Sequence, residues 1–437
     1  MQERTTGFLG LTGYQWLVFA AAWLGWGFDA FDALLFNYVA PGCISSLLHL
    51  TPGTPEARAQ ISQWTGILTS MLLLGWAVGG ILMGRLADRI GRSRTLMLTM
   101  LIYSVATAAC ALVNNIWELM FFRVLASLGI GGEWAAGAAM VAEVVPEKRR
   151  VEMGALLYTA APLGVFMAGW VSHWMTQEVF PGQTEVSWRY VFLFGLLPAA
   201  VAMAVRWFIQ EPERWHRHEA ATVGLSALFR PEYRRLTFSG LGMAVTALLA
   251  WWCSNAFLPL VAESLGMAWA SAQGLAQEAT RTAALGWKAS AINLFNLGGL
   301  FGTLLTIPTA KLLGRRATFG IYFLLSGVIT IGAFGLPLEP GARMAALFLM
   351  GMTNYGVLGS FTYYLPELFP TRLRGTGSGF CYNVGRVITA AGPYVVGAVA
   401  ASGVGMVETM AFAGFIPLAG LLLLPWVVET RGQQLAD

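Results

Sequence analysis

The chain has 437 residues, of which 56% are hydrophobic and only 11% charged, with a mean hydropathy of +0.61 and a formal net charge of +4. A water-soluble domain carries roughly a quarter charged residues, so this composition excludes an ordinary soluble protein and indicates a chain with lipid as its solvent. The small positive charge does not indicate nucleic acid as a partner, because the basic residues lie in short connectors rather than on one face.

Twelve apolar runs come close to or exceed the roughly 20 residues that a helix needs to cross a bilayer. Six of them precede a polar, basic stretch at 211–235, and six follow it. The sequence therefore predicts an all-α membrane protein with twelve transmembrane helices: an N-terminal six-helix bundle at 1–210, a cytoplasmic linker at 211–235 and a C-terminal six-helix bundle at 236–437. The runs lie at 14–41, 62–87, 93–113, 117–145, 151–174, 188–210, 236–262, 286–311, 317–337, 343–367, 377–401 and 406–428.

Basic residues are distributed unequally between the two sets of connectors. If the N-terminus is cytoplasmic, nearly all of them fall on the inner side, as the positive-inside rule requires. The connectors on the outer side then hold only Arg58, Arg189, Arg281, Lys288 and Arg343. We therefore expect a multi-pass protein of the cell (inner) membrane with both termini in the cytoplasm.

Two short motifs occur twice. The connector GRLADRIGRSR has a weaker copy, AKLLGRR, 223 positions later, counted from Gly91 to Gly314. A second motif is repeated at a distance of 224 residues, from Glu143 to Glu367. Because both connectors keep one register, the pattern predicts two parallel repeats related by a pseudo-two-fold axis along the membrane normal.

These motifs resemble the major facilitator superfamily over essentially the whole chain. GRLADRIGRSR looks like its signature connector between helices 2 and 3, RVLASLGIGGEW is similar to its helix-4 motif, and EPERW and PELFPTRLRGTG resemble its metabolite-uptake branches. DAFD in helix 1, GGE in helix 4 and NVGR in helix 11 look most like proton-coupled carboxylate symporters of the sialate/lactate and aromatic-acid kind. The resemblance implies a secondary transporter with the proton as coupling ion and no bound cofactor.

The resemblance also implies a gating role for charged residues at the cytoplasmic helix ends. In the family, such residues form salt bridges between helices that stabilise the outward-facing state and break as the cytoplasmic side opens. Here they are Asp88, Arg89, Arg92, Glu143 and Glu367. The alternative is that these charges only set topology and solubility. Lys311 occupies the place of Asp88 in the second connector, which argues against the same charge latch in the C-terminal half.

Four charged residues lie deep inside predicted helices of the N-terminal half: Asp29, Asp32, Arg123 and Glu133. Such residues are costly in a membrane and usually line a cavity or pair with one another. If helices 1 and 4 face each other, as the family fold implies, Asp32 and Arg123 can meet. We expect Asp32, in preference to Asp29, to load and release the proton; the alternative is a static ion pair. Glu133, about 15 Å from Arg123 along the helix, is either a second proton site or a structural partner.

Arg386 is the only formal charge inside the predicted C-terminal bundle. A guanidinium in a dry cavity matches a carboxylate through two parallel hydrogen bonds, so we expect Arg386 to hold an anionic substrate. The alternative is an arginine that reaches a membrane interface. Asn383 lies one turn away and is expected on the same face. Further candidates for the substrate site are Asn255, Asn293, Asn296, Tyr355 and Tyr382, with Tyr158, Phe166, Phe361 and Tyr363 as other aromatic residues that could line the cavity.

Together these features predict a monomeric secondary transporter that takes up a small organic anion with protons. The substrate class is a monocarboxylate such as lactate, an aromatic acid or a sugar acid. An enzyme is not expected, because the sequence holds no nucleophile–base or metal-ligand constellation. Two alternatives stay open: a multidrug or organic-cation transporter of the same fold, and a transporter-like sensor that binds its ligand without moving it.

Overall fold

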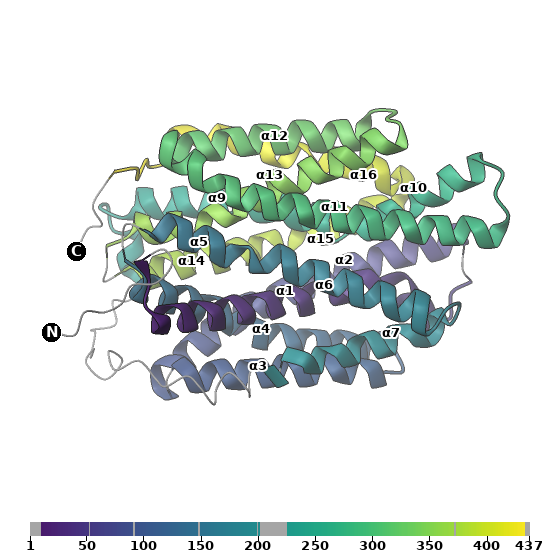
Figure 1. Cartoon of the computed structure of the whole chain (residues 1–437), viewed down its shortest axis with the longest axis horizontal. Helices are drawn as coiled ribbons and strands as arrows, with labels where there is room; N and C mark the ends of the chain where they lie inside the picture. The colour runs from purple at the N-terminus through teal and green to yellow at the C-terminus, as the bar shows by residue number, and fades with distance from the viewer. Residues whose placement is uncertain are drawn as a thin grey trace.

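The computed structural model describes residues 10–51, 53–90, 92–146, 149–198, 200–201, 225–370 and 373–432. Over these residues the chain is helical and contains no strand. The helices run along the long axis of the molecule, and the first described helix begins at the end where the last one finishes (Figure 1). In this view α1, α3, α4 and α7 lie in the lower part and α11, α12, α13 and α16 in the upper part.

Among the described residues, the helices with complete bounds are seven that end before residue 194 and nine that begin after residue 224. The first group is α1 Gly13–Leu47, α2 Pro55–Ile90, α3 Arg92–Ala109, α4 Ile116–Val144, α5 Arg150–Tyr158, α6 Ala160–His173 and α7 Thr184–Leu193. The second group is α9 Arg234–Asn255, α10 Leu258–Ala272, α11 Gln277–Leu312, α12 Arg315–Gly335, α13 Pro340–Leu368, α14 Arg374–Thr389, α15 Ala391–Val399, α16 Met406–Ala413 and α17 Phe415–Gly420.

Nine helical segments among the described residues are long and apolar enough to cross a membrane. They are Gly13–Leu47, Pro55–Met83, Arg150–Val179, Arg234–Ala272, Gln277–Leu312, Arg315–Gly335, Pro340–Leu368, Arg374–Val404 and Met406–Trp426. Helices also occupy the positions of the other three expected spans: α3, α4 and α7. The C-terminal part of the sixth expected span, 202–210, lies outside the described residues. The molecule is thus a multi-pass helical membrane protein.

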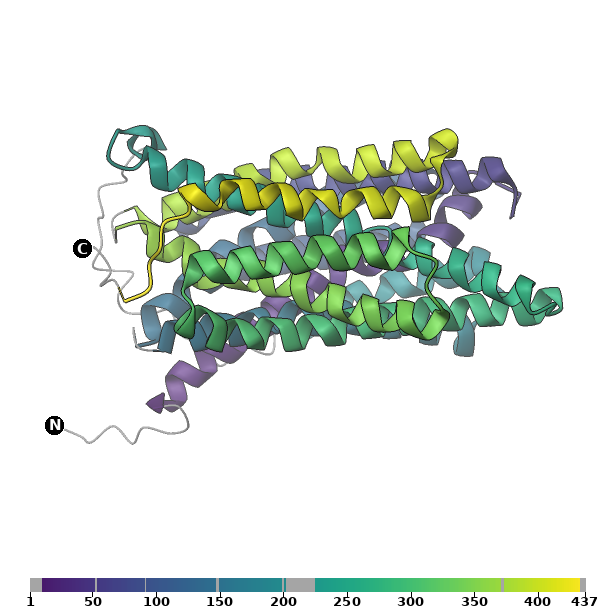
Figure 2. The ribbon, with the colours of Figure 1, turned by 90° about the horizontal axis from the view of Figure 1, so that it is seen from above.

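Several helices are longer than their apolar cores. The apolar run at 286–311 belongs to α11, which starts at Gln277 and has 36 residues. At 1.5 Å per residue this helix is about 54 Å long, well beyond the roughly 30 Å of hydrocarbon in a bilayer. Hydropathy detects only the part in lipid, whereas the backbone hydrogen bonds continue into water. The hairpin of α10 and α11 therefore extends past the neighbouring helices (Figures 1 and 2).

Four of the spans are interrupted, and a proline explains each interruption. A proline has no N–H for the carbonyl four residues before it, and its ring clashes with that carbonyl. Accordingly α5 ends at Tyr158, four residues before Pro162, and α9 ends at Asn255, four residues before Pro259. In the same way α14 ends before Pro393 and α16 before Pro417. One of these breaks places Tyr158 in the wall of the cavity described below.

Close packing positions the helices around this cavity. A Cβ atom added at Gly79 of α2 would lie 2.1 Å from the Leu128 carbonyl oxygen of α4, so only glycine permits this approach. Helix α1 packs against α4 and α6, and α14 packs against both α9 and α2. Helices α5 and α6 contact α11, and α5 also contacts α13. The segments before residue 202 and after residue 224 thus meet along α2–α14 and α5–α13.

Candidate functional site

A cavity of about 460 Å³ of empty space lies where these two groups of helices meet. Its walls are mainly aromatic and aliphatic, as is typical of sites for small molecules. Among the described residues that line it there is one charged side chain, Arg386, and no acid. The aromatic walls come from α1, α2, α5, α9 and α14 and consist of Trp26, Trp76, Tyr158, Trp251, Trp252 and Tyr382.

Arg386 lies in α14, 12 residues after the helix begins at Arg374, and only 3% of its surface is exposed. Its guanidinium lies 4.2 Å from the ring centroid of Trp76 and 4.6 Å from that of Tyr382. One of its N–H groups donates to the Asn383 side-chain oxygen at 3.1 Å. The guanidinium therefore points into the molecule rather than to a membrane interface, and two aromatic faces stabilise its charge.

The two helix-1 acids lie in different surroundings, although both are almost completely buried. Arg123 of α4 lies 3.8 Å from the Asp32 carboxylate and donates to the backbone carbonyls of Asp32 and Ala33 at 3.2 and 3.0 Å. Asp29, one turn earlier, is close enough to Arg386 for the two charges to interact. Thus Asp32 belongs to the α1–α4 contact, and Asp29 interacts electrostatically with the buried arginine. The Glu133 side chain lies outside the described residues.

The other predicted substrate residues separate into three groups. Asn383 and Tyr382 accompany Arg386 on α14. Asn255, Asn296 and Tyr355 are all buried, and the Tyr355 hydroxyl donates to the Asn296 side-chain oxygen at 2.8 Å.

Asn293, in contrast, is exposed on the outer surface of α11 and does not contribute to the buried site. It is three residues from Asn296, yet the two lie on opposite sides of the boundary between the buried and exposed faces of the helix. Of the aromatic candidates, Tyr158 lines the cavity, whereas Phe166 is 40% exposed.

Among the predicted gating residues, the structure describes the side chain of Glu367. Both of its oxygens accept hydrogen bonds from Arg315 of α12, at 3.0 and 2.7 Å, and one also accepts from the Thr430 hydroxyl at 2.6 Å. This bidentate pair joins α13 to α12 within the C-terminal half rather than joining the two halves. The side chains of Asp88, Arg89, Arg92 and Glu143 lie outside the described residues.

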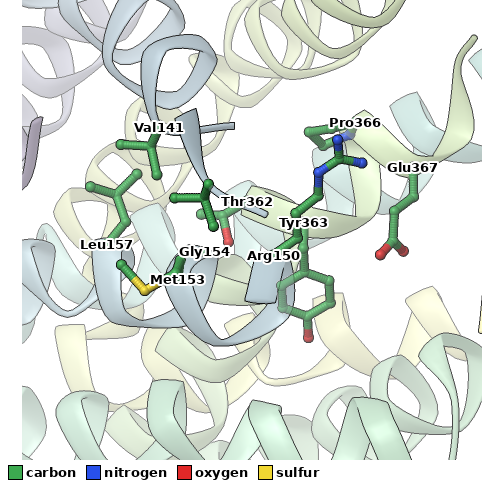
Figure 3. Close-up of a pocket in the computed structure, with 10 residues that line it drawn as sticks. Val141, Arg150, Met153, Gly154, Leu157, Thr362, Tyr363, Pro366 and Glu367 are labelled. Carbon is green, nitrogen blue, oxygen red and sulfur yellow. The ribbon is translucent and has the colours of Figure 1, made fainter. Parts of the chain in front are cut away.

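A second cavity, of about 450 Å³, lies on the cytoplasmic side of the first, on the predicted orientation. Figure 3 shows it between α4 and α5 on one side and α13 on the other, with Arg150, Tyr363 and Glu367 in its wall. The two cavities follow one another along α5 and α13: Tyr158 and Leu358 line the first, and Gly154 and Thr362 line the second. A Cβ atom at Gly154 would lie 2.8 Å from the Thr362 hydroxyl oxygen, so the two helices are in tight contact at this level.

Polar contacts between the halves close the molecule at both ends. On the side of the second cavity, Lys311 of α11 forms an ion pair with Glu152 of α5. Towards the other end, Lys288 of α11 donates to the Tyr38 carbonyl of α1 at 2.8 Å. The Asn37 amide donates to the Ala256 carbonyl at 3.0 Å, beside the break that Pro259 causes. The first cavity is therefore enclosed from both sides.

Sequence reasoning missed the tryptophans of the cavity and the Lys311–Glu152 pair. Membrane aromatics are usually assigned to interfacial belts, but such belts lie at the ends of spans. Trp76 and Trp26 instead lie near the middle of their apolar runs, at 62–87 and 14–41, and this position could have identified them. Lys311 departs from the family pattern, in which an aspartate occupies this position of the connector. Its partner Glu152 lies 159 residues earlier in the chain, and nothing in the sequence indicates that the two residues meet.

Comparisons with known proteins agree with this architecture. A 4-methylmuconolactone transporter, assigned as probable, from Cupriavidus pinatubonensis is 29% identical over 435 residues, which cover 95% of this chain and 90% of the relative. A gentisate transporter from Corynebacterium glutamicum is 26% identical over 430 residues, covering 95% and 88% of the two chains. The crystal structure of a D-xylose–proton symporter superimposes with a TM-score of 0.72 at 16% identity, over 97% of this chain and all of the other.

The family model of the Major Facilitator Superfamily matches residues 16–393, which is most of the chain. The relatives found by sequence are transporters, in agreement with the buried cavity and the many apolar helices. The chain therefore belongs to the Major Facilitator Superfamily and is a membrane transporter, not an enzyme.

Proposed function

We propose that the protein is a proton-coupled symporter that takes up a small organic anion, with an aromatic or conjugated monocarboxylate as the substrate. The observation that carries this proposal is the buried guanidinium of Arg386 in a cavity lined by four tryptophans and two tyrosines. The cation suits a carboxylate, and the aromatic walls suit a planar apolar body. Relatives named for gentisate and gallate, both aromatic monocarboxylates, support the same class.

An organic-cation substrate is less compatible with this cavity. The described residues of its wall include Arg386 and no carboxylate, so a quaternary amine would meet a like charge. Such a like-charge contact in a dry site is unfavourable by several kcal/mol. The anion is therefore the function that the geometry supports best.

The proposal includes twelve membrane spans in two six-helix bundles, separated by the linker at 211–235, with both termini in the cytoplasm of an inner-membrane protein. Nine long apolar helices, the additional helices α3, α4 and α7, and the concentration of packing within each half support this arrangement. The charge distribution of the connectors supports the orientation. The substrate then binds between the bundles, near the middle of the membrane.

For the coupling step, we propose that protons enter through the helix-1 carboxylates. Asp32 is held by Arg123, and Asp29 feels the charge of Arg386. A substrate carboxylate at Arg386 competes with ionised Asp29 for the same cation, so binding of the anion favours a protonated acid on α1. Neutral acids weaken the contacts that hold α1 in place, which links proton uptake to movement of the helix.

Transport into proteoliposomes tests the proposal. Uptake of radiolabelled gentisate should follow an inward proton gradient, collapse with a protonophore, and be inhibited by other aromatic carboxylates but not by tetraethylammonium. Arg386→Ala should raise the KM by about 30-fold or more, because removing one partner of a buried charge pair costs about 2 kcal/mol or more. Arg281→Ala, at an exposed arginine of α11, is the matched control and should leave the KM unchanged. Inhibition by the quaternary amine, or an unchanged KM in Arg386→Ala, would contradict the anion site.

A further inference from the structure

Two tyrosines line the Arg386 cavity, and they come from different halves of the molecule. Tyr158 is the last residue of α5 in the N-terminal half, and Tyr382 lies one turn before Arg386 in α14 of the C-terminal half. Both side chains are at least nine-tenths buried. The anion site proposed above depends on the guanidinium alone and gives the two hydroxyls no role.

A chain of hydrogen bonds connects the guanidinium to the N-terminal half. Arg386 donates to the Tyr382 hydroxyl, and the hydroxyls of Tyr382 and Tyr158 are hydrogen-bonded to each other. Since a hydrogen bond spans about 3 Å between its heavy atoms, two bonds in sequence place the Tyr158 oxygen within about 6 Å of a guanidinium nitrogen. A carboxylate that is bound to Arg386 is therefore within reach of the Tyr158 hydroxyl.

The Tyr158 ring is in contact with both halves. It stands at 79° to the Trp26 ring of α1, and the two ring centroids lie 5.2 Å apart. A Cβ atom added at Gly359 of α13 would lie 3.4 Å from the same ring, which is van der Waals contact. The side chain of Tyr158 thus extends from the N-terminal half to the C-terminal half. Its hydroxyl moves away from Arg386 whenever α5 and α13 separate.

A carboxylate accepts more hydrogen bonds than the guanidinium alone supplies. Its two oxygens have about four lone-pair sites, and a bidentate arginine donates to two of them. A tyrosine O–H rotates about its C–O bond, so a hydroxyl that is bonded to another hydroxyl can donate to an anion instead. An anion that receives bonds from Arg386, Tyr382 and Tyr158 is held by both halves at once.

From these contacts we propose that Tyr158 is a positioning residue that closes the two halves over the bound anion, its hydroxyl exchanging the bond with Tyr382 for one with the substrate carboxylate. This inference rests on the proposed anion site at Arg386. Arg386 and Tyr382 belong to one half and bind the carboxylate whether the halves are open or closed. Tyr158 reaches it only when α5 and α13 are in contact, so its bond stabilises the closed, loaded carrier and speeds transport more than it strengthens binding.

Two measurements with gentisate separate transport from binding. Equilibrium exchange of the radiolabelled anion in proteoliposomes, at saturating concentration on both sides, measures movement of the loaded carrier, and calorimetry on the purified full-length protein measures the Kd. In Tyr158→Phe we expect the exchange rate to fall about 10-fold, because a hydrogen bond to a charged group is lost from the closed form, and the Kd to rise less than about threefold. Tyr382→Phe should raise the Kd about 10-fold, because its hydroxyl belongs to the same half as Arg386.

Tyr322→Phe is the matched control, since this tyrosine is also buried but its hydroxyl donates to the Gly302 carbonyl within the C-terminal half, at 3.0 Å. It should keep the wild-type exchange rate and Kd. If the Tyr158–Tyr382 bond only holds the halves together, its loss does not slow their separation, and an undiminished exchange rate in Tyr158→Phe would overturn the proposal. A raised Kd with an unchanged saturated rate would overturn it as well, because Tyr158 would then be a binding contact only. Gentisate binding that is unchanged in Arg386→Ala would instead refute the anion site itself, so the two failures are distinguishable.

Discussion

The buried pair of Asp32 and Arg123 joins α1 to α4 at a depth where charges are costly. If Asp32 carries the transported proton, Asp32→Asn fixes the neutral form, because an amide does not ionise. We expect this variant to lose uphill accumulation of the anion in a proton gradient and to keep counterflow exchange of substrate across the membrane. Both rates are measured in proteoliposomes.

A purely structural pair predicts a different outcome for the same substitution. Arg123 would then lose its counter-ion, and the protein would lose thermal stability together with both transport modes. Asp29→Asn is the informative companion, since Asp29 lies on the same helix but interacts electrostatically with Arg386. Uphill accumulation that persists at the wild-type ratio in Asp32→Asn, but not in Asp29→Asn, would assign the proton to Asp29.

At the level of single residues, the sequence predicted charges better than aromatic or amide groups. Asp29, Asp32, Arg123 and Arg386 stand out because any charge in an apolar run needs a reason. Trp251 gives no such signal, since tryptophan occurs on lipid-facing and interior surfaces alike. The contrast of Asn293 and Asn296 has the same origin: both faces of a membrane helix are apolar, so the sequence does not fix its rotation.

The N-terminus of α12 is capped by a residue that lies more than 100 positions later in the chain. Its N-cap residue is Gly314, with a φ of +91°, which has no side chain to accept from the first N–H groups of the helix. Glu429 supplies this acceptor: its oxygens accept from the backbone N–H groups of Arg315 and Arg316 at 2.9 and 3.1 Å. Partial burial alone would raise the pKa of Glu429, but these bonds, with one from the Arg431 N–H, outweigh it and lower the pKa below the usual value of 4.5.

This contact predicts a pH-dependent contribution to stability. A carboxylate whose pKa is lower in the folded state stabilises that state fully above pH 4.5, and the contribution is lost as the pH falls through the lower, folded value. We expect Glu429→Gln to destabilise the protein by about 1 kcal/mol at pH 7, as for other helix caps, and the difference from wild type to shrink below pH 4. Thermal unfolding of both proteins in detergent from pH 7 to pH 3 measures it. A difference that is independent of pH would mean that the charge of Glu429 does not contribute.

At the level of elements, apolar runs predict where helices cross the membrane but not where they break or end. The spans expected at 151–174, 236–262, 377–401 and 406–428 each contain a proline that divides them in the structure. In these four spans the break lies four residues before the proline. Pro41, Pro308 and Pro366, however, lie inside α1, α11 and α13, which continue past them, so the sequence does not tell which prolines divide a helix. In contrast, the capping of α12 by Glu429 depends on a contact over 114 residues, which the local sequence does not encode.

The molecule as a whole is closed on both sides of the Arg386 cavity. Asn37 and Lys288 join the halves towards one end, while the Gly154–Thr362 contact and the Lys311–Glu152 pair join them towards the other. A transporter that alternates between two open forms passes through such an enclosed state, and each set of contacts opposes opening at its own end. The Lys311–Glu152 pair lies on the side of the second cavity, which follows the Arg386 cavity along α5 and α13. It is therefore placed to oppose opening on that side.

The free energy involved is small, because Lys311 is 44% exposed and solvent-exposed ion pairs contribute about 0–1 kcal/mol. This amount is nevertheless sufficient to change the ratio of closed to open molecules by up to about 5-fold. A cysteine at Thr362, introduced as Thr362→Cys, reports opening between α5 and α13, since the native cysteines are all buried. In inside-out vesicles we expect Lys311→Gln and Glu152→Gln each to speed its reaction with an impermeant maleimide about 2- to 5-fold, and the double variant to be no faster than either single one.

Arg149→Gln is the matched control for these single and double variants. Arg149 also pairs with Glu152, at 3.4 Å, but both residues belong to the same half, so their contact does not oppose separation of the halves. This variant should therefore leave the labelling rate unchanged. If Lys311 and Glu152 contact each other in the closed state, either single variant already removes their interaction, and the double variant removes nothing more. Increases in labelling rate that add up in the double variant would instead show that the two charges act independently. Non-additivity would instead identify the pair as one latch, built from a lysine at the position where the first connector has an aspartate.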